Sequence, residues 1–257
     1  NTDIQAKSKR KVIITGSTTV LPIAQRAAEL YMDVNNDINI TVRGGGSGVG
    51  IAALIDGRCD IADASRSMKT KELKIAREKG INPVENIIAI DGIAIVVNKS
   101  NPVKNITMEQ LREIYTGKIV NWKELGGDNA QIVSISRDYS SGTFEVFKKL
   151  VLKGDKVKND VLMLASNKGV STTVNQSNGA LGYIGLGYIS DDLKVLTVNN
   201  VYPTKENVSN NNYPIARPLF MYTNGKPKGF IKYFIDFILS DNGKKIVEET
   251  GYVPVQQ

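Results

Sequence analysis

The sequence of 257 residues contains no histidine and only one cysteine, Cys59. Without histidine, a Ser-His-Asp triad and every histidine-ligated metal site are excluded. One cysteine allows neither an internal disulfide framework nor a metal site built from several thiolates. The chain therefore lacks the residues on which many hydrolases and metalloenzymes depend, and we expect no metal and no cofactor.

Long apolar runs are missing as well. No stretch approaches the roughly 18 apolar residues that span a bilayer. The first residues, "NTDIQAKSKRKV", are polar and contain no signal-peptide core. We expect the chain as given to be soluble, and the removal of a signal or lipid anchor from an exported precursor stays open.

The composition is typical of a globular protein and has an excess of basic residues. Hydrophobic residues make up 41% of the chain, whose length suits two lobes of roughly 100 to 150 residues each. The net charge of +7 favours an anionic partner. Basic segments at 7–11 and 68–80 raise the alternative of nucleic acid, but the second has the pattern of a solvated helix and neither carries a nucleic-acid signature. We therefore expect no nucleic-acid partner.

Strand-like and helix-like runs alternate almost from end to end, which is typical of an α/β fold with mainly parallel sheets flanked by helices. The run 86–98 is too long for one ordinary strand without a bend at its "DG". The segment 213–225 is held extended by its two prolines. These features predict two crossings between lobes, near 91–98 and 213–220. The expected lobes are a discontinuous first lobe, 1–93 and 214–257, to which the C-terminal helices return, and a second lobe, 94–213.

Three turns share one chemistry: "TGSTTV" (15–20), "GGGSGVG" (44–50) and "YSSGTF" (139–144). Each follows a strand, opens a helix and places Gly beside Ser or Thr. Unpaired backbone N–H groups, the helix dipole and the hydroxyl groups all favour an anion at such a helix start. Taken singly, each turn has an alternative interpretation as an N-cap with a tight turn. If all three open into one crevice, they surround a small anion with donors.

Arg137 follows the strand 132–136 and precedes Ser141 by four residues. Its guanidinium fork suits a tetrahedral oxyanion, and the alternative is a surface ion pair with Asp138 or another acid. Other uses of a Gly-rich turn fail on spacing. Residues 44–51 contain no G-x-G-x-x-G, no GK[ST] follows a glycine run, and Ser47 lacks the second glycine of a nucleophile elbow. Donors without a nucleophile or general base indicate binding without chemistry.

Longer stretches then carry a resemblance: "ITGSTTVLP", "IADASRSM", "LREIYTGKIVNWKELGG", "ISRDYSSGTFEVF" and "YPIARPLFMYTNG", with others in consistent order over residues 12–255. Together they resemble the substrate-binding component of bacterial high-affinity phosphate ABC transporters. The resemblance implies the two-lobed type II periplasmic-binding-protein fold, with phosphate held in the cleft and delivered to a membrane permease. It also implies a monomer without enzymatic activity, outside the cytoplasm, tethered by a lipid anchor that this sequence does not include.

The resemblance also implies a set of phosphate ligands at the matching positions: Thr18, Thr19, Ser47, Ser65, Arg137, Ser141, Gly142 and Thr143. Family members with Ser-Asp in the third loop use that carboxylate to accept a phosphate proton, and the matching position here is Ser65. Either the acceptor comes from elsewhere, with Asp91 the first candidate and Asp63 the second, or selectivity works in another way. The alternative is that either one orients Arg66 or Arg137. Arg66 itself joins the site or lies just outside it.

Capture of phosphate, followed by closure of the lobes, is thus the leading hypothesis. We expect the ligand to favour closure, because only the closed form joins the first-lobe donors to Arg137 and Ser141. A receptor for sulfate or molybdate is an alternative within the same class. A phosphoester hydrolase is disfavoured by the missing histidine and by the lack of an evident metal cluster in the sequence. A structural or signalling module is the remaining alternative.

Overall fold

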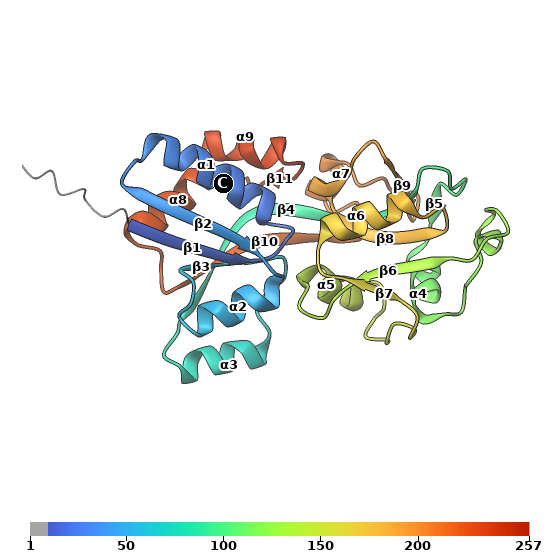
Figure 1. Cartoon of the computed structure of the whole chain (residues 1–257), viewed down its shortest axis with the longest axis horizontal. Coiled ribbons are helices and arrows are strands. Elements are labelled where there is room, and N and C mark those ends of the chain that lie inside the picture. The colour runs from blue at the N-terminus through green and yellow to red at the C-terminus, as the bar shows by residue number, and fades with distance from the viewer. Residues whose placement is uncertain (1–9, 257) are drawn as a thin grey trace, which may run out of the picture.

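Strand β4 (Pro83–Asn98) belongs to the sheets of both halves of the chain. The computed structural model describes residues 10–256. It has a two-lobed α/β architecture in which the lobes lie side by side and β4 and β10 (Ala216–Asn224) run between them (Figure 1). The first nine residues of the predicted first lobe, which include most of the basic segment 7–11, lie outside the described residues, as does Gln257.

The sheet of the first lobe combines parallel and antiparallel pairing. Its parallel strands pair in the order β2 (Ile38–Gly44), β1 (Arg10–Gly16) and β3 (Ile61–Ala64). Strand β10 then joins β3 to β4 in antiparallel register. Buried side chains alternate with less buried ones along β1, where Val12 and Ile14 enter the core. The carboxyl ends of the three parallel strands lie at one edge of the sheet, so the turns that follow them meet there.

Helices cover both faces of this sheet (Figure 1). One face carries α1 (Leu21–Val34) with α8 (Gly229–Leu239) and α9 (Asp241–Glu249), and the other carries α2 (Ser47–Ile55) and α3 (Thr70–Glu78). The buried side of α1 is rich in alanine, and such small side chains let the helix lie close to the sheet. The C-terminal helices α8 and α9 pack on α1, so they lie beside the sheet that β1 and β2 form.

The basic stretch 68–80 contains α3, of whose residues only Ala76 is buried. This is the solvated amphipathic helix that the sequence predicts. None of the helices within residues 10–256 is long and apolar enough to cross a membrane.

The sheet of the second lobe is built on the far half of β4. Strands β8 (Ala180–Gly185) and β9 (Leu193–Val198) pair with it in antiparallel register, and β6 (Val133–Arg137) pairs in parallel with β8 and β7 (Leu162–Leu164). The short β5 (Asn105–Ile106) extends β9. The helical elements described in this lobe are α4 (Met108–Thr116), η1 (Trp122–Leu125), α5 (Gly142–Leu150), α6 (Asn167–Gln176), η2 (Leu186–Tyr188) and α7 (Lys205–Ser209).

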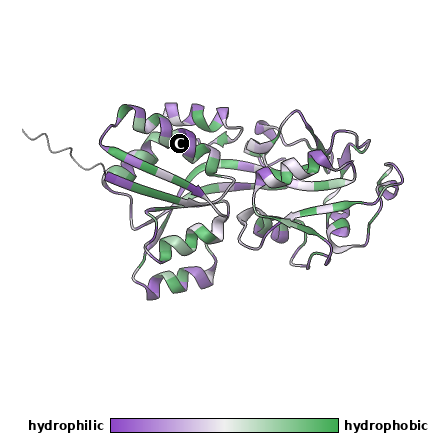
Figure 2. Ribbon diagram, viewed as in Figure 1, coloured by the Kyte–Doolittle hydropathy of each residue, from purple (hydrophilic) through white to green (hydrophobic). Residues whose placement is uncertain are grey.

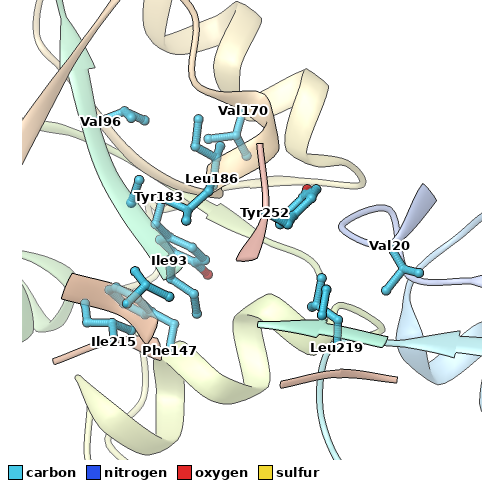
Figure 3. Close-up of a cluster of buried hydrophobic side chains, with 14 of the residues drawn as sticks. Val20, Ile93, Val96, Phe147, Val170, Tyr183, Leu186, Ile215, Leu219 and Tyr252 are labelled. Carbon is cyan, nitrogen blue, oxygen red and sulfur yellow. The ribbon is translucent and has the colours of Figure 1, made fainter. Parts of the chain in front are cut away.

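One hydrophobic core runs through both lobes, and Figure 2 shows hydrophobic residues along the strands of each. In the second lobe the rings of Phe147 and Tyr183 stack with centroids 4.1 Å apart. Figure 3 shows Tyr252 between this stack and the first-lobe residues Val20 and Leu219. Tyr252 directly precedes the short strand β11 (Val253–Pro254), which pairs with β4. The lobes are therefore in apolar contact beside the crossing strands.

Strand β4 changes partners at the dipeptide Asp91-Gly92. Up to Gly92 it pairs with β10, and from Ile93 onward it pairs with β8. The sequence predicts a bend at this dipeptide and a passage between lobes. In the structure β4 is one continuous strand, and it changes its partner strand at the dipeptide where the sequence predicts the bend. A strand of this length is possible because two sheets share it.

The turns of the two lobes touch directly. The N–H of Gly48 donates to the carbonyl of Ser140 at 2.9 Å, and the Ser140 hydroxyl donates to the carbonyl of Gly45 at 3.2 Å. Farther out, Lys69 Nζ lies 2.8 Å from Glu145 Oε1. The structure is therefore a closed form, in which the Gly-rich run meets the opposite lobe through its backbone.

One carboxylate is buried inside the first lobe without a partner. Asp63, on β3, is 1% exposed, and neither of its carboxylate oxygens has a hydrogen-bond partner among residues 10–256. Burial raises the pKa of Asp63 well above its ordinary value, and no neighbouring charge contributes to the shift. The protonated form of Asp63 therefore suits the folded state better than the charged form.

Asp63 should make the folded state less stable as the pH rises. The stabilising contribution of the protonated carboxyl is complete below the unfolded pKa of about 4 and is lost as the pH rises toward the raised folded pKa. Asparagine is neutral at every pH, so Asp63→Asn should melt higher than the unsubstituted chain by a margin that grows from about pH 4 to pH 8.

Melting temperatures measured across this pH range check the prediction. Asp241→Asn is the matched control, because the side chain of Asp241 is 98% exposed. A margin for Asp63→Asn that stays constant with pH, as we expect for the control, would contradict the prediction.

Candidate functional site

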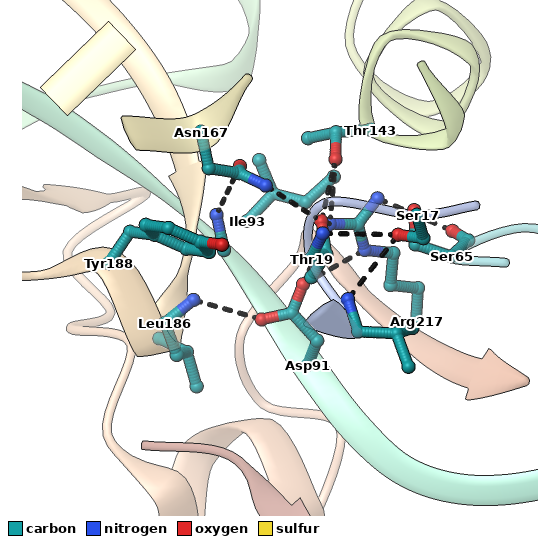
Figure 4. A network of polar contacts seen from close by, with 12 residues as sticks. Ser17, Thr19, Ser65, Asp91, Ile93, Thr143, Asn167, Leu186, Tyr188 and Arg217 are labelled. Atoms are coloured by element: carbon teal, nitrogen blue, oxygen red, sulfur yellow. Dashed lines mark hydrogen bonds and ion pairs between the residues drawn. The ribbon is translucent and has the colours of Figure 1, made fainter. Parts of the chain in front are cut away.

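The three Gly-Ser/Thr turns meet where the lobes touch, and Figure 4 shows two of them through Ser17, Thr19 and Thr143. Oγ1 of Thr19, in the turn after β1, lies 3.1 Å from Oγ1 of Thr143 at the start of α5. Ser47 begins α2, and a β-carbon added at Gly142 would lie only 2.3 Å from its Oγ. The hydroxyl of Ser65, which follows β3, lies 3.3 Å from that of Ser47. Backbone and hydroxyl donors of both lobes thus face one small region.

The structure brings together the whole set of residues predicted as ligands, and all of them are buried: Thr18, Thr19, Ser47, Ser65, Arg137, Ser141, Gly142 and Thr143. They come from five different segments of the chain. Such convergence follows from the fold, because the strands that precede these segments end at the edge that each sheet turns toward the other lobe.

The hydroxyl groups divide between capping and facing the site. Ser141 Oγ accepts from the N–H of Phe144 at 3.3 Å, as an N-cap side chain does. Ser17 Oγ accepts from the N–H of Thr19 at 3.1 Å within the turn before α1. Helix α2 instead follows Gly46, whose φ of 99° favours glycine. The N-cap alternative is therefore right for Ser141, and the other hydroxyls are left to face one another.

Arg137 is held in place by backbone carbonyls. The carbonyls of Leu164 and Ala165 accept from its Nε at 3.1 Å and its Nη2 at 2.9 Å. Nη1 is buried and has no partner among the described residues. The surface ion pair with Asp138 is wrong, because Arg137 is 1% exposed and Asp138 accepts from the N–H of Ser140 at 2.8 Å. Burial lowers the pKa of Arg137, although a guanidinium stays charged at neutral pH.

A second arginine, Arg217 on β10, was not predicted from the sequence. Its Nε and Nη2 donate to Asp91 Oδ2 at 2.9 and 2.7 Å, and its Nη1 donates to the carbonyl of Ser65 at 3.3 Å. Nη2 also reaches the hydroxyls of Thr143 at 3.0 Å and Thr19 at 3.3 Å (Figure 4). A signal for this role was present in the sequence, because the first crossing segment contains an acid, Asp91, and the second contains Arg217. Strands β4 and β10 place these two residues directly opposite each other.

Asn167, the first residue of α6, was also missed. Its Nδ2 donates to the hydroxyls of Thr18 at 3.1 Å and Thr19 at 3.0 Å, and its Oδ1 accepts from the N–H of Gly185 at 3.2 Å (Figure 4). Asn167 is fully buried. In the sequence "SNKG" it is indistinguishable from a turn residue, and no local pattern points to its role.

The three residues predicted beside the ligands have different surroundings. Both oxygens of Asp91 are engaged, Oδ2 by Arg217 and Oδ1 by the N–H of Leu186 at 2.9 Å. Burial raises its pKa, and Arg217 opposes the shift. The partner of Asp91 is thus neither Arg66 nor Arg137. The carboxylate of Asp63 has no partner among the described residues.

Arg66 is directed away from the hydroxyl cluster. Its Nη2 lies 2.7 Å from Glu72 Oε1, and its Nη1 donates to Glu72 Oε2 at 2.8 Å and to the carbonyl of Ser67 at 3.0 Å. Among residues 10–256, no group of three or more His, Cys, Asp or Glu side chains is placed to hold a metal ion. The chemistry available at the site is hydrogen-bond donation to an anion.

The chain matches known proteins over nearly its whole length. The PBP superfamily domain matches residues 1–242. The phosphate-binding protein PstS of Bacillus subtilis is 35% identical over 253 residues, which cover 98% of this chain and 83% of that protein. PstS of Borreliella burgdorferi is 36% identical over 261 residues, which cover 97% of this chain and 91% of that protein.

Solved structures share the fold. A crystal structure from Clostridium perfringens, described as a candidate phosphate ABC transporter substrate-binding protein with bound phosphate, is 36% identical with a TM-score of 0.89 and covers 96% of this chain and 100% of that one. An ABC-type phosphate transport receptor of Vibrio cholerae is 34% identical with a TM-score of 0.77, at 95% and 100% coverage. By sequence and by fold, the chain belongs to the PstS family of phosphate-binding proteins within the PBP superfamily.

Proposed function

We propose that the chain binds inorganic phosphate between its two lobes, outside the cytoplasm, and delivers it to the membrane permease of an ABC transporter for import. The observation that carries the proposal is Arg137, whose buried guanidinium reaches Thr18 on the opposite lobe at 3.3 Å while Nη1 has no partner among the described residues. A buried cation with a free donor is stabilised by an anion. The names of the relatives, PstS and phosphate transport receptor, support phosphate as that anion.

The proposed ligands surround the anion from both lobes: Thr18, Thr19, Ser47, Ser65, Arg137, Ser141, Gly142 and Thr143. The starts of α2 and α5 add backbone N–H groups and the positive ends of two helix dipoles. Hydrogen bonds to a charged group contribute about 1.5 to 3 kcal/mol each. About six to ten of them would offset the desolvation of a divalent anion and leave about micromolar affinity or better.

Closure of the lobes is coupled to this binding. Only the closed form joins Thr18 and Thr19 of one lobe to Arg137 and Thr143 of the other, so an anion that needs all of them favours that form. We take 1–93 and 214–257 as one moving lobe and 94–213 as the other, with the crossings near 91–98 and 213–220 as hinges.

The remaining parts of the proposal concern partners and location. The chain acts as a monomer. It is a binding protein and not an enzyme, because the site offers hydrogen-bond donors without a nucleophile or a general base. Nucleic acid is not a partner in this proposal. A lipid anchor upstream of the given sequence, which the family resemblance implies, would keep the protein near its permease.

Loss of the Arg137 guanidinium should abolish tight phosphate binding. Methionine has a similar length but no donors and no charge, so Arg137→Met removes the charge-assisted bonds and should weaken binding at least about 100-fold. Calorimetric titration of phosphate-stripped protein with inorganic phosphate measures the change.

Arg112→Met is the matched control in the same lobe, because the Arg112 guanidinium forms surface ion pairs, with Asp155 at 2.8 Å and with Glu109 at 3.6 Å, and lies outside the site. Thermal unfolding verifies that both variants are folded. Unchanged phosphate affinity in folded Arg137→Met, or no binding by the unsubstituted chain at micromolar phosphate, would refute the proposed function.

Alanine at Gly46 should oppose closure. Gly46 has a φ of +99°, and a β-carbon there would lie 2.6 Å from the Ser140 hydroxyl and 2.9 Å from the Ser140 carbonyl on the opposite lobe. We expect Gly46→Ala to bind phosphate at least about tenfold more weakly, the result of roughly 1.4 kcal/mol lost from the closed form. Small-angle scattering at equal phosphate should give a larger radius of gyration.

Gly57→Ala separates closure from backbone strain. Gly57 also has a positive φ, of +65°, but no atom lies within 4 Å of an added β-carbon. Its alanine variant should lose stability without losing phosphate affinity. Equal affinities and equal radii for the two variants would show that the Gly46 contact does not control closure.

A further inference from the structure

A crevice with a volume of about 460 Å³ lies between the lobes, beside the hydroxyl cluster. Arg217 belongs to its wall, but the hydroxyl-bearing residues proposed as phosphate ligands do not line it. Its volume falls within the range of about 300 to 1,000 Å³ that is typical of sites for small organic molecules. The crevice is therefore a separate space, which the binding of a bare anion does not use.

The crevice takes its walls from both lobes, and we call it the α3–α5 crevice. One wall is the loop 66–70, which leads into α3, and the other is the outer face of α5 with Val146, Lys149 and Leu150. Figure 1 shows α3 and α5 on the same side of the crossing strands, one in each lobe. Because the walls belong to different lobes, the crevice has this shape only in the closed form.

The inner surface of the crevice is largely apolar. Met68 and Phe220 line it and are 7% and 2% exposed, and the half-buried Val146, Leu150 and Pro218 stand beside them. Apolar walls of this kind favour a ligand with an apolar body, since such a ligand leaves water when it binds. A bare inorganic anion would gain nothing from them.

The edge of the crevice is basic. Arg66 pairs with Glu72, and Lys69 with Glu145. Lys149 is exposed and forms no ion pair within residues 10–256. Two further features favour negative charge here.

The first is helix α3, which begins at Thr70 in the crevice wall, so the positive end of its dipole lies there. The second is Arg66, which is 8% exposed and whose Nε has no partner among the described residues. A ligand with one acidic group would meet this basic edge while its body covers the apolar surface.

We propose that the α3–α5 crevice is a second ligand site, which takes a small organic anion with an apolar body, of the class of aromatic carboxylates and sulfonates. The apolar walls hold the body, and Lys149 with the start of α3 holds the acidic group. The site is distinct from the hydroxyl cluster, and its ligand is not a bare oxyanion.

The crevice is coupled to the phosphate site by its own walls. The loop 66–70 directly follows Ser65, and the crevice face of α5 belongs to the helix that Gly142 and Thr143 begin. The closure that joins the phosphate ligands therefore also forms the crevice. Each ligand favours the closed form, so each should raise the affinity for the other by the same factor. The inference goes beyond the proposed function, and only this coupling rests on it.

Anilinonaphthalene sulfonate is a suitable probe, because it joins an aromatic body to one sulfonate and fluoresces in apolar surroundings. The dye is titrated into the phosphate-stripped chain with and without saturating phosphate. Phosphate then occupies the hydroxyl cluster, so the sulfonate cannot bind there. We expect the dye to bind at least about fivefold more tightly with phosphate. Calorimetry with saturating dye should show the same gain in phosphate affinity.

Val146→Trp tests the location of the dye by filling the crevice. The indole occupies space that the dye needs, so dye binding should weaken at least about tenfold. Val120→Trp is the matched control, because Val120 is 46% exposed in the same lobe and does not line the crevice. Phosphate calorimetry shows whether each variant is folded.

Lys149→Met tests the charge at the edge and keeps the inference open to refutation if Val146→Trp does not fold. The loss of one exposed ammonium should weaken dye binding about two- to fivefold. Lys118→Met is the matched control, since Lys118 is also exposed in the second half of the chain and lies outside the crevice. Phosphate affinity without dye should stay the same in both lysine variants.

The outcomes are distinguishable. Dye affinity that phosphate leaves unchanged or lowers would place the dye outside the crevice and overturn the inference. Equal dye affinity in Val146→Trp and Val120→Trp, or in Lys149→Met and Lys118→Met, would also overturn it. Failure of the unsubstituted chain to bind phosphate refutes the proposed function instead, and the two pairs of variants then decide alone whether the crevice binds the dye.

Discussion

The buried ion pair between Asp91 and Arg217 is the interaction on which the site between the lobes depends. It joins β4 to β10 where both strands pass from lobe to lobe, with Arg217 Nη2 2.7 Å from Asp91 Oδ2. Such a pair adds little net stability, because desolvation of the charges offsets their attraction, but either charge buried alone would be costly. The two groups must therefore stay together. Their pairing fixes the guanidinium that holds Thr19 and Thr143.

The same carboxylate connects the two lobes through its other oxygen. Asp91 Oδ1 accepts from the N–H of Leu186, which begins η2, and Tyr188 in the same short helix donates to the carbonyl of Thr18. A first-lobe strand thus positions a second-lobe turn. With the crossing proposed as the hinge, Asp91 lies where relative movement of the lobes would be smallest, so its contacts would persist while an outer contact such as Lys69 with Glu145 separates. The residues that anchor the site thus lie in the proposed hinge.

The sequence was sufficient for the order of strands and helices and for the three donor turns, because periodicity and helix-start chemistry act over a few neighbouring residues. It was insufficient for Arg217, whose role depends on pairing with a carboxylate 126 positions away. Asn167 was missed for a similar reason, since its partners come from β8 and from the opposite lobe. The alternative interpretation of Arg137, a surface ion pair with Asp138, failed because burial is a property of the assembled sheet.

The closed form also carries an electrostatic penalty that an anion removes. Arg137 and Arg217 are both buried, and within residues 10–256 only Arg217 of the two has a carboxylate partner. The charge of Arg217 contributes, after burial, to lowering the pKa of Arg137. Without an anion, closure buries one uncompensated guanidinium between two helix N-termini, whose dipoles are also positive there. A dianion neutralises the guanidinium and opposes both dipoles. The cost of burying Arg137 without an anion is therefore one physical reason for the proposed coupling of closure to the ligand.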